Sequence, residues 1–201
     1  MIKTVIFDVG GVLKSDSSIN IEKYVCSRLN ITTEKYHTVC SEIIPSLVKG
    51  EITELQFWKL FLKNINSSKK LDSVKNVWKD AHKKSFKINE QVFDMAKKIK
   101  EKGYIIAVLS NATQSNVDIN RKSKVYSLFP VCILSCEVGL MKPDPKIYKL
   151  TLKKLNAKPK ETLFIDDRKI NIEPAKKLGI QTILYKSSEQ LKKEFIKLNL
   201  L

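Results

Sequence analysis

The chain has 201 residues, a length that suits one domain of ordinary size or a core domain with a small inserted one. Hydrophobic residues make up 43% and charged residues 29%, a globular composition that excludes a disordered chain. No apolar run approaches the roughly 20 residues needed to cross a bilayer. The N-terminus enters an apolar strand at once and lacks the longer apolar stretch of a secretory signal. We therefore expect a cytoplasmic protein with no membrane partner.

The net charge is +16, from 37 basic and 21 acidic residues, and such an excess can mark a nucleic-acid partner. Only Arg28, Arg121 and Arg168 are arginines, and the lysines are scattered along the chain. A nucleic-acid reader usually adds arginine forks and exposed aromatic rings. We therefore expect no nucleic-acid partner and interpret the charge as a general attraction for anionic substrates.

The four cysteines form no Cys-x-x-Cys pair, and the chain has two histidines. A zinc site needs tighter pairing and more histidines. We expect four reduced and mostly buried thiols, at positions 26, 40, 132 and 136.

In chain order, the first predicted element is a strand over 3–7, whose nearly continuous apolar run fits a strand buried on both faces of a parallel sheet. Residues from about 18 to 85 form an all-helical pattern, with Thr53 as one helix N-cap. From Asn89 onward, helices and strands alternate. The further strands are expected at 104–109, 131–134, 162–165 and 180–185, and the later helices at 145–155, 171–178 and 188–200.

This alternation predicts an α/β fold, a doubly wound parallel sheet of Rossmann-like type with helices on both faces. The helical stretch predicts an inserted α-helical cap domain over 15–88, and the core domain then comprises 1–14 and 89–201. Within the cap, the aromatic residues Phe57, Trp58 and Phe61 are at helical spacing and are expected to form its core.

Polar residues follow three of the predicted strands directly. They are Asp8, the pair Ser110 and Asn111, and the pair Asp166 and Asp167. Ligands of parallel sheets bind at the carboxyl ends of the strands, so these side chains should converge on one edge. Three carboxylates make a hard oxygen site that suits Mg²⁺, and the Gly10–Gly11 loop can turn backbone N–H groups toward an anion.

Four segments then carry a resemblance to a known family. They are Phe7–Leu13, Leu109–Ala112, Gly139–Pro145, and Phe164–Asp167 with Asn171 and Gly179. The sequence resembles the haloacid dehalogenase (HAD) superfamily of phosphatases and related hydrolases, in the subset with Asp-x-Gly in the first motif and a helical cap. Each motif alone has an ordinary explanation, such as a turn or a helix cap. Four of them in order across the chain make coincidence improbable.

The resemblance implies a role for each matching residue. Asp8 would be the nucleophile that forms an aspartyl-phosphate, Ser110 would hold the phosphoryl group, and Asn111 would help to orient it. Lys142 would neutralise the charge of nucleophile and phosphate, and the Gly10–Gly11 loop would contribute to phosphate binding.

The resemblance also implies Mg²⁺, held by Asp8, the Gly10 carbonyl and Asp167. Asp166 would lie beside Asp167 at the metal, and Asn171 would brace that loop. The implied partner is a small phosphorylated metabolite, with sugar phosphates as one candidate class.

One residue departs from the usual phosphatase motif. Its general acid and base, an aspartate two positions after the nucleophile, is replaced by Gly10. Proton transfer by such a group contributes about 10²–10⁴-fold. Two alternatives therefore stay open, a metal-independent dehalogenase-type hydrolase and a non-catalytic protein that binds a phosphometabolite. Asp16 is the nearest downstream carboxylate, although its Ser-Asp-Ser-Ser context indicates a helix-starting loop.

Lys14 lies just past the first motif and could reach a phosphate or the substrate. Among so many lysines, we expect it to be one more solvated side chain.

Overall fold

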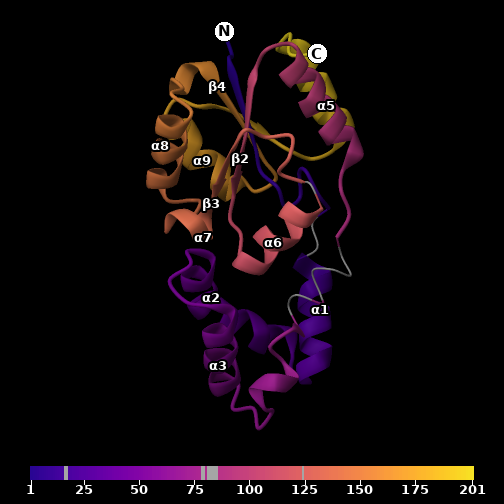
Figure 1. The fold of residues 1–201 in the computed structure, drawn as a ribbon, viewed down its shortest axis with the longest axis vertical. Coiled ribbons are helices and arrows are strands. Elements are labelled where there is room, and N and C mark those ends of the chain that lie inside the picture. The colour runs from indigo at the N-terminus through magenta and orange to yellow at the C-terminus, as the bar shows by residue number, and fades with distance from the viewer. Residues whose placement is uncertain (16–17, 78–79, 81–85, 124) are drawn as a thin grey trace.

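A computed structural model describes residues 1–15, 18–77, 80, 86–123 and 125–201 (Figure 1). Asp16 and the part of the predicted helical stretch at 78–79 and 81–85 lie outside the described residues. None of the described helices is long and apolar enough to cross a membrane.

The core is one five-stranded sheet in which every pair of neighbouring strands is parallel. The strand order is β3-β2-β1-β4-β5. The strands are β1 Thr4–Phe7, β2 Ile105–Ser110, β3 Val131–Leu134, β4 Thr162–Asp166 and β5 Gln181–Leu184. This confirms the predicted doubly wound α/β fold, and the chain changes direction across the sheet between β1 and β4.

The carboxyl ends of β2 and β4 each lie one residue beyond the predicted end. Ser110 and Asp166 were expected after their strands, but both are the last residues of β2 and β4. The ladder extends this far because Ser110 is in register with Leu134 of β3, and Asp166 with Leu184 of β5. Both side chains are therefore held by the sheet itself rather than by a loop.

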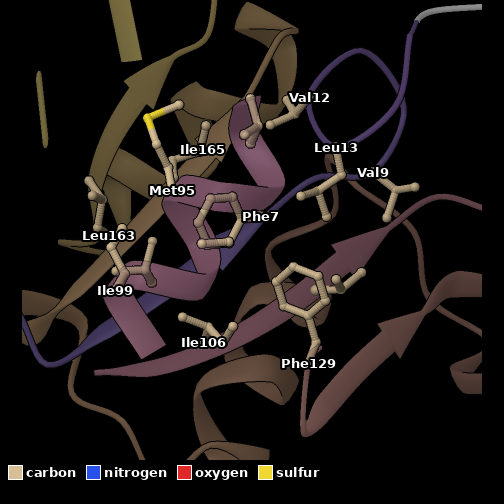
Figure 2. Close-up of a cluster of buried hydrophobic side chains, with 14 of the residues drawn as sticks. Phe7, Val9, Val12, Leu13, Met95, Ile99, Ile106, Phe129, Leu163 and Ile165 are labelled. Atoms are coloured by element: carbon tan, nitrogen blue, oxygen red, sulfur yellow. The ribbon is translucent and has the colours of Figure 1, made fainter. Parts of the chain in front are cut away.

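Helices cover both faces of the sheet, and alternate strand residues point to opposite faces. Val5 and Phe7 belong to a cluster with α5 Glu90–Glu101 and α10 Ser188–Lys197, part of which Figure 2 shows. Ile6 belongs to a second cluster with α8 Pro145–Lys154 and α9 Lys169–Lys177. These three residues of β1 are each at most 1% exposed, which places β1 at the centre of the core.

Local signals in the sequence explain where these helices begin. Asn89 accepts a hydrogen bond from the Val92 N–H at the start of α5, and Asp144 accepts one from the Lys146 N–H at the start of α8. Pro145 occupies the first turn of α8, where its missing N–H costs nothing. The remaining elements of the core are α6 Gln114–Lys122, α7 Ser135–Val138 and the 3₁₀ turn η2 Pro159–Glu161.

The segment between β1 and α5 is helical, as predicted. It contains α1 Ser18–Leu29, α2 Thr33–Val48, α3 Glu54–Asn64 and the 3₁₀ turn η1 Leu71–Ser73, which lie together at one end of the molecule (Figure 1). Thr53 caps α3, as predicted, in a reciprocal arrangement with Gln56. A hydrophobic cluster of its own includes Phe57, Trp58 and Phe61, each at most 1% exposed, which confirms their assignment to the core of this segment.

The helical segment contacts the sheet domain at its connecting segments, at the end of α2 and at α3, where Glu54 Oε1 accepts a hydrogen bond from the Ser115 N–H at 3.2 Å. The two segments that connect it to the sheet domain run side by side. Lys14 and Ile88 form an isolated antiparallel β-bridge, and the Asn89 N–H donates to the Leu13 carbonyl. At the far end of α2, the Ser135 hydroxyl donates to the Val48 carbonyl at 2.7 Å. These contacts position the helices over the carboxyl edge of the sheet (Figure 1).

Candidate active site

Asp8 follows β1 at the carboxyl edge of the sheet and is 7% exposed. Its Oδ1 atom accepts hydrogen bonds from the Val9 N–H at 2.7 Å and from Lys142 Nζ at 2.9 Å. Its Oδ2 atom accepts none from any described residue. One carboxylate oxygen is therefore fixed, and the other is left to react or to bind a cation.

The Lys142 ammonium lies between two carboxylates and is 1% exposed. Its Nζ atom is 2.9 Å from Asp8 Oδ1 and 2.7 Å from Asp166 Oδ2, and it donates to the Leu109 carbonyl at 3.0 Å. An ammonium group has three N–H donors, so these contacts use all of them. Lys142 neutralises and orients Asp8 without a donor left for a ligand.

The Asn111 side chain holds the Lys142 backbone. Its Nδ2 atom donates to the Lys142 carbonyl and its Oδ1 atom accepts from the Lys142 N–H, both at 2.8 Å. This pair of bonds fixes the loop that presents Lys142. A further role of Asn111 toward a phosphoryl group stays a prediction.

Asp166 is fully buried and accepts four hydrogen bonds. Oδ1 receives the Arg168 N–H at 2.9 Å and Asn171 Nδ2 at 2.9 Å, while Oδ2 receives Lys142 Nζ at 2.7 Å and Asn171 Nδ2 at 3.0 Å. These bonds occupy the four lone-pair positions of a carboxylate. Asp166 therefore anchors Lys142, and Asn171 braces it in the predicted way.

The three carboxylates can still surround a metal ion. Asp8, Asp166 and Asp167 each offer an oxygen atom within 4.8 Å of the others. Asp166 already accepts four hydrogen bonds, so Asp8 and Asp167 are the members of this group whose oxygens we expect to coordinate an ion. An all-oxygen donor set of this size fits Mg²⁺. The metal roles of Asp8, Asp166, Asp167 and the Gly10 carbonyl stay predictions.

Gly10 and Gly11 differ in whether their positions can accommodate a side chain. Gly11 has φ +77°, and a Cβ there would overlap the Asp167 carboxylate, so only glycine fits. Gly10 does not have a positive φ, and a Cβ there would meet nothing within 4 Å. The space that an acidic side chain would need at Gly10 is therefore open.

Ser110 is 4% exposed at the end of β2, next to β1 in the sheet. Its hydroxyl makes no hydrogen bond with any described residue. The structure thus leaves Ser110 as a free donor at the edge where Asp8 lies, which suits its predicted contact with a phosphoryl group.

Burial controls the protonation of this cluster. The pKa of Asp8 is raised to about 7, because desolvation by burial and the negative charge of Asp166 together outweigh the opposing attraction of Lys142. Burial alone would lower the pKa of Lys142, but the charges of Asp8 and Asp166 outweigh it and raise that pKa. Lys142 is therefore a permanent cation.

Two features near the site were not foreseen, the burial of Lys14 and a hydrogen bond from Tyr148. The prediction that Lys14 is a solvated side chain is wrong, because it is 9% exposed where the two connecting segments meet. The apolar neighbours Val12, Leu13 and Ile88 were the available signal. Tyr148 donates to the Asn171 carbonyl at 2.7 Å and supports it from α8, and nothing in the sequence pattern indicated that contact.

Replacing Lys142 by methionine should leave two facing buried carboxylates without a counter-charge. We expect Lys142→Met to lower the free energy of unfolding by about 3–5 kcal/mol without divalent metal. Urea unfolding in EDTA measures this, with the exposed Lys146→Met as a matched control expected to change stability by less than about 0.5 kcal/mol. Equal stabilities for the two variants would contradict the central role of Lys142.

The chain is similar in sequence to known proteins over most of its length. The family model for haloacid dehalogenase-like hydrolases matches residues 5–185. Bifunctional epoxide hydrolase 2 of Rattus norvegicus is 27% identical over 95% of this chain, which covers 38% of the rat protein. The phosphorylated carbohydrates phosphatase of Thermotoga maritima is 26% identical over 90% of this chain and 83% of its own length. The chain thus spans well under half the length of the rat protein.

A solved structure extends the similarity to the fold. A HAD family enzyme from Bacteroides thetaiotaomicron, in complex with magnesium and inorganic phosphate, is 29% identical with a TM-score of 0.76. The match covers 92% of this chain and 95% of that one. With the motifs assembled at one sheet edge and the family model matching nearly the whole chain, this protein belongs to the haloacid dehalogenase-like hydrolases.

Proposed function

We propose that the protein is a Mg²⁺-dependent phosphatase that hydrolyses a small phosphomonoester through phospho-Asp8. The observation that carries this proposal is the state of Asp8, whose Oδ1 is held by Lys142 and Val9 while Oδ2 is free. In this proposal, residues 15–88 form a cap domain over a core domain of 1–14 and 89–201, and the enzyme acts in the cytoplasm.

The reaction follows from the positions of these groups. Asp8 Oδ2 attacks phosphorus, the bond from phosphorus to the ester oxygen breaks, and the leaving alkoxide takes a proton from water. A second water molecule then attacks phosphorus, which releases inorganic phosphate and the Asp8 carboxylate, and its proton passes to solvent. Lys142 orients Asp8 and favours its ionised form in both steps, and Ser110 donates to the phosphoryl oxygens. Mg²⁺, held by Asp8, Asp167 and the Gly10 carbonyl, would supply further charge neutralisation when bound.

The absence of a side chain at Gly10 determines the turnover rate that we expect. Without a side chain there, no positioned acid protonates the leaving group, so we expect slow turnover and the best rates on esters with good leaving groups. Sugar phosphates are the proposed substrate class, supported by the similarity to the phosphatase from Thermotoga maritima named above.

Phosphate release from a panel of sugar phosphates, nucleotides and an aryl phosphate tests the proposal. Release is expected with Mg²⁺ and not with EDTA, and Asp8→Asn should abolish it because the amide cannot form the acyl phosphate. Folded Asp8→Asn protein that keeps the wild-type rate would refute the mechanism. Release of halide from haloacids in EDTA, in place of phosphate release, would favour the dehalogenase alternative.

The open space at Gly10 predicts a gain of function. We expect Gly10→Asp to raise kcat for poor leaving groups by about tenfold, a part of what an optimised acid supplies. Gly10→Asn is the matched control, since it has the same size and no acidic proton. Equal rates for the two variants would show that a missing acid does not limit this enzyme.

The raised pKa of Asp8 predicts a pH-dependent metal site. A proton on Asp8 competes with Mg²⁺, and the pKa of this carboxyl is about 7. Mg²⁺ affinity should therefore rise about tenfold per pH unit below that value and level off above it. Calorimetric titration of Mg²⁺ across the neutral range measures this rise. Asp8→Asn should bind Mg²⁺ more weakly and without the rise, and an equal rise in this variant would assign the proton to another group.

A further inference from the structure

Lys14 is fixed at the point where the helical segment joins the sheet domain. Its backbone bridges Gly10 on one side and Ile88 on the other, and its N–H donates to the Val9 carbonyl at 2.9 Å. The loop that follows Asp8 therefore closes on Lys14. The base of this side chain cannot move without disturbing either that loop or the second connecting segment.

The Lys14 side chain is buried next to the loop that follows Asp8. Its Nζ atom is 5.7 Å from the centre of the Phe86 ring, within the range of a cation–π contact. Burial lowers the pKa of Lys14, and the negative charge of Asp8 acts in the opposite direction. Among the described residues, no carboxylate or carbonyl accepts a hydrogen bond from Nζ.

An inventory of side-chain donors shows which of them remain free for an anion near Asp8, in addition to the backbone N–H groups of the Gly10–Gly11 loop. Lys14 and Lys142 are the two buried lysines in the described part of the chain. Lys142 gives all three donors to Asp8, Asp166 and Leu109, and the Asn111 amide is used by the Lys142 backbone. Ser110 offers one neutral hydroxyl. Lys14 is thus the buried cation whose donors are uncommitted.

The charges of the site require such a cation. Three carboxylates face the single charge of Lys142, and a bound Mg²⁺ would only bring the cluster to neutrality. A phosphoryl dianion entering this buried region would then be uncompensated, which is costly at low dielectric constant. A second buried ammonium, carried by the loop that follows Asp8, would reduce that cost.

We propose that Lys14 binds the phosphoryl group at Asp8 directly, as the anion-binding cation of this site, while Lys142 serves to position Asp8. This inference rests on the proposed phosphatase function for the identity of the anion. It changes the predicted role of Lys142 from a phosphate ligand to a positioning residue, and it makes the junction with the helical segment part of the phosphate site.

Binding of inorganic phosphate tests the proposal without requiring turnover. Calorimetry in saturating Mg²⁺ should show that Lys14→Met binds phosphate roughly ten- to a hundredfold more weakly than wild type. Lys14→Arg keeps the charge and should retain most of the affinity. Lys87→Met removes an exposed lysine close by in the same junction and should bind phosphate as wild type does.

The outcomes separate this proposal from the proposed function. Wild-type phosphate affinity in a folded Lys14→Met protein would overturn the role of Lys14, even if phosphatase activity is confirmed. Wild-type phosphate affinity together with a raised KM for esters that carry a second anionic group would show that Lys14 binds the leaving group. That result would also overturn the binding of the phosphoryl group by Lys14. Weakened phosphate binding in a protein that hydrolyses no ester would support Lys14 and refute the phosphatase. Unchanged Mg²⁺ affinity and thermal unfolding of Lys14→Met exclude an indirect effect.

Discussion

The structure of the site depends on one buried ammonium group between two carboxylates. Lys142 lies 2.9 Å from Asp8 and 2.7 Å from Asp166, with almost no exposure to solvent. Charges in such a position are tolerated only when every one is paired and hydrogen bonded. That condition explains why so many neighbouring groups form hydrogen bonds with Lys142 and with its two carboxylate partners. The Leu109 carbonyl takes the third proton of Lys142, and Asn171 fills the remaining positions on Asp166.

The sheet order allows this pairing to form. Residues 8 and 166 are far apart in sequence, but β1 and β4 are neighbours and parallel, with Phe7 in register with Ile165. The carboxyl ends of these strands therefore present Asp8 and Asp166 to the same space. The loop before α8 enters that space with Lys142, and Asn111, just after β2 on the other side of β1, holds its backbone. Strands from both sides of β1 are thus needed to orient one nucleophile.

The sequence was sufficient to predict the sheet, the helical segment and the residues gathered at the carboxyl edge, because apolar periodicity and strand ends are local properties. The hydrogen-bond partners of the polar atoms could not be predicted in this way. The resemblance placed Asp167 ahead of Asp166 as a metal ligand, but it did not reveal the four hydrogen bonds that Asp166 accepts or the contact of the Asp167 carboxylate with Gly11. The burial of Lys14 was missed for a similar reason. A lysine in a basic chain is expected in water, and only the pairing of two segments 74 residues apart, at Lys14 and Ile88, encloses it.

Gly10 and Lys14 belong to one structural unit, because the loop after Asp8 closes through the bridge between them. Relative to the usual phosphatase motif, this unit has lost a carboxylate at position 10 and has a buried cation at position 14. Both features shift the local charge in the positive direction. Under the proposed function, the site would then rely more on charge stabilisation of the phosphoryl group than on proton transfer to the leaving group. A site of that kind favours leaving groups that need no proton and holds inorganic phosphate firmly. Product release is then expected to contribute to the slow turnover that the absent acid already predicts.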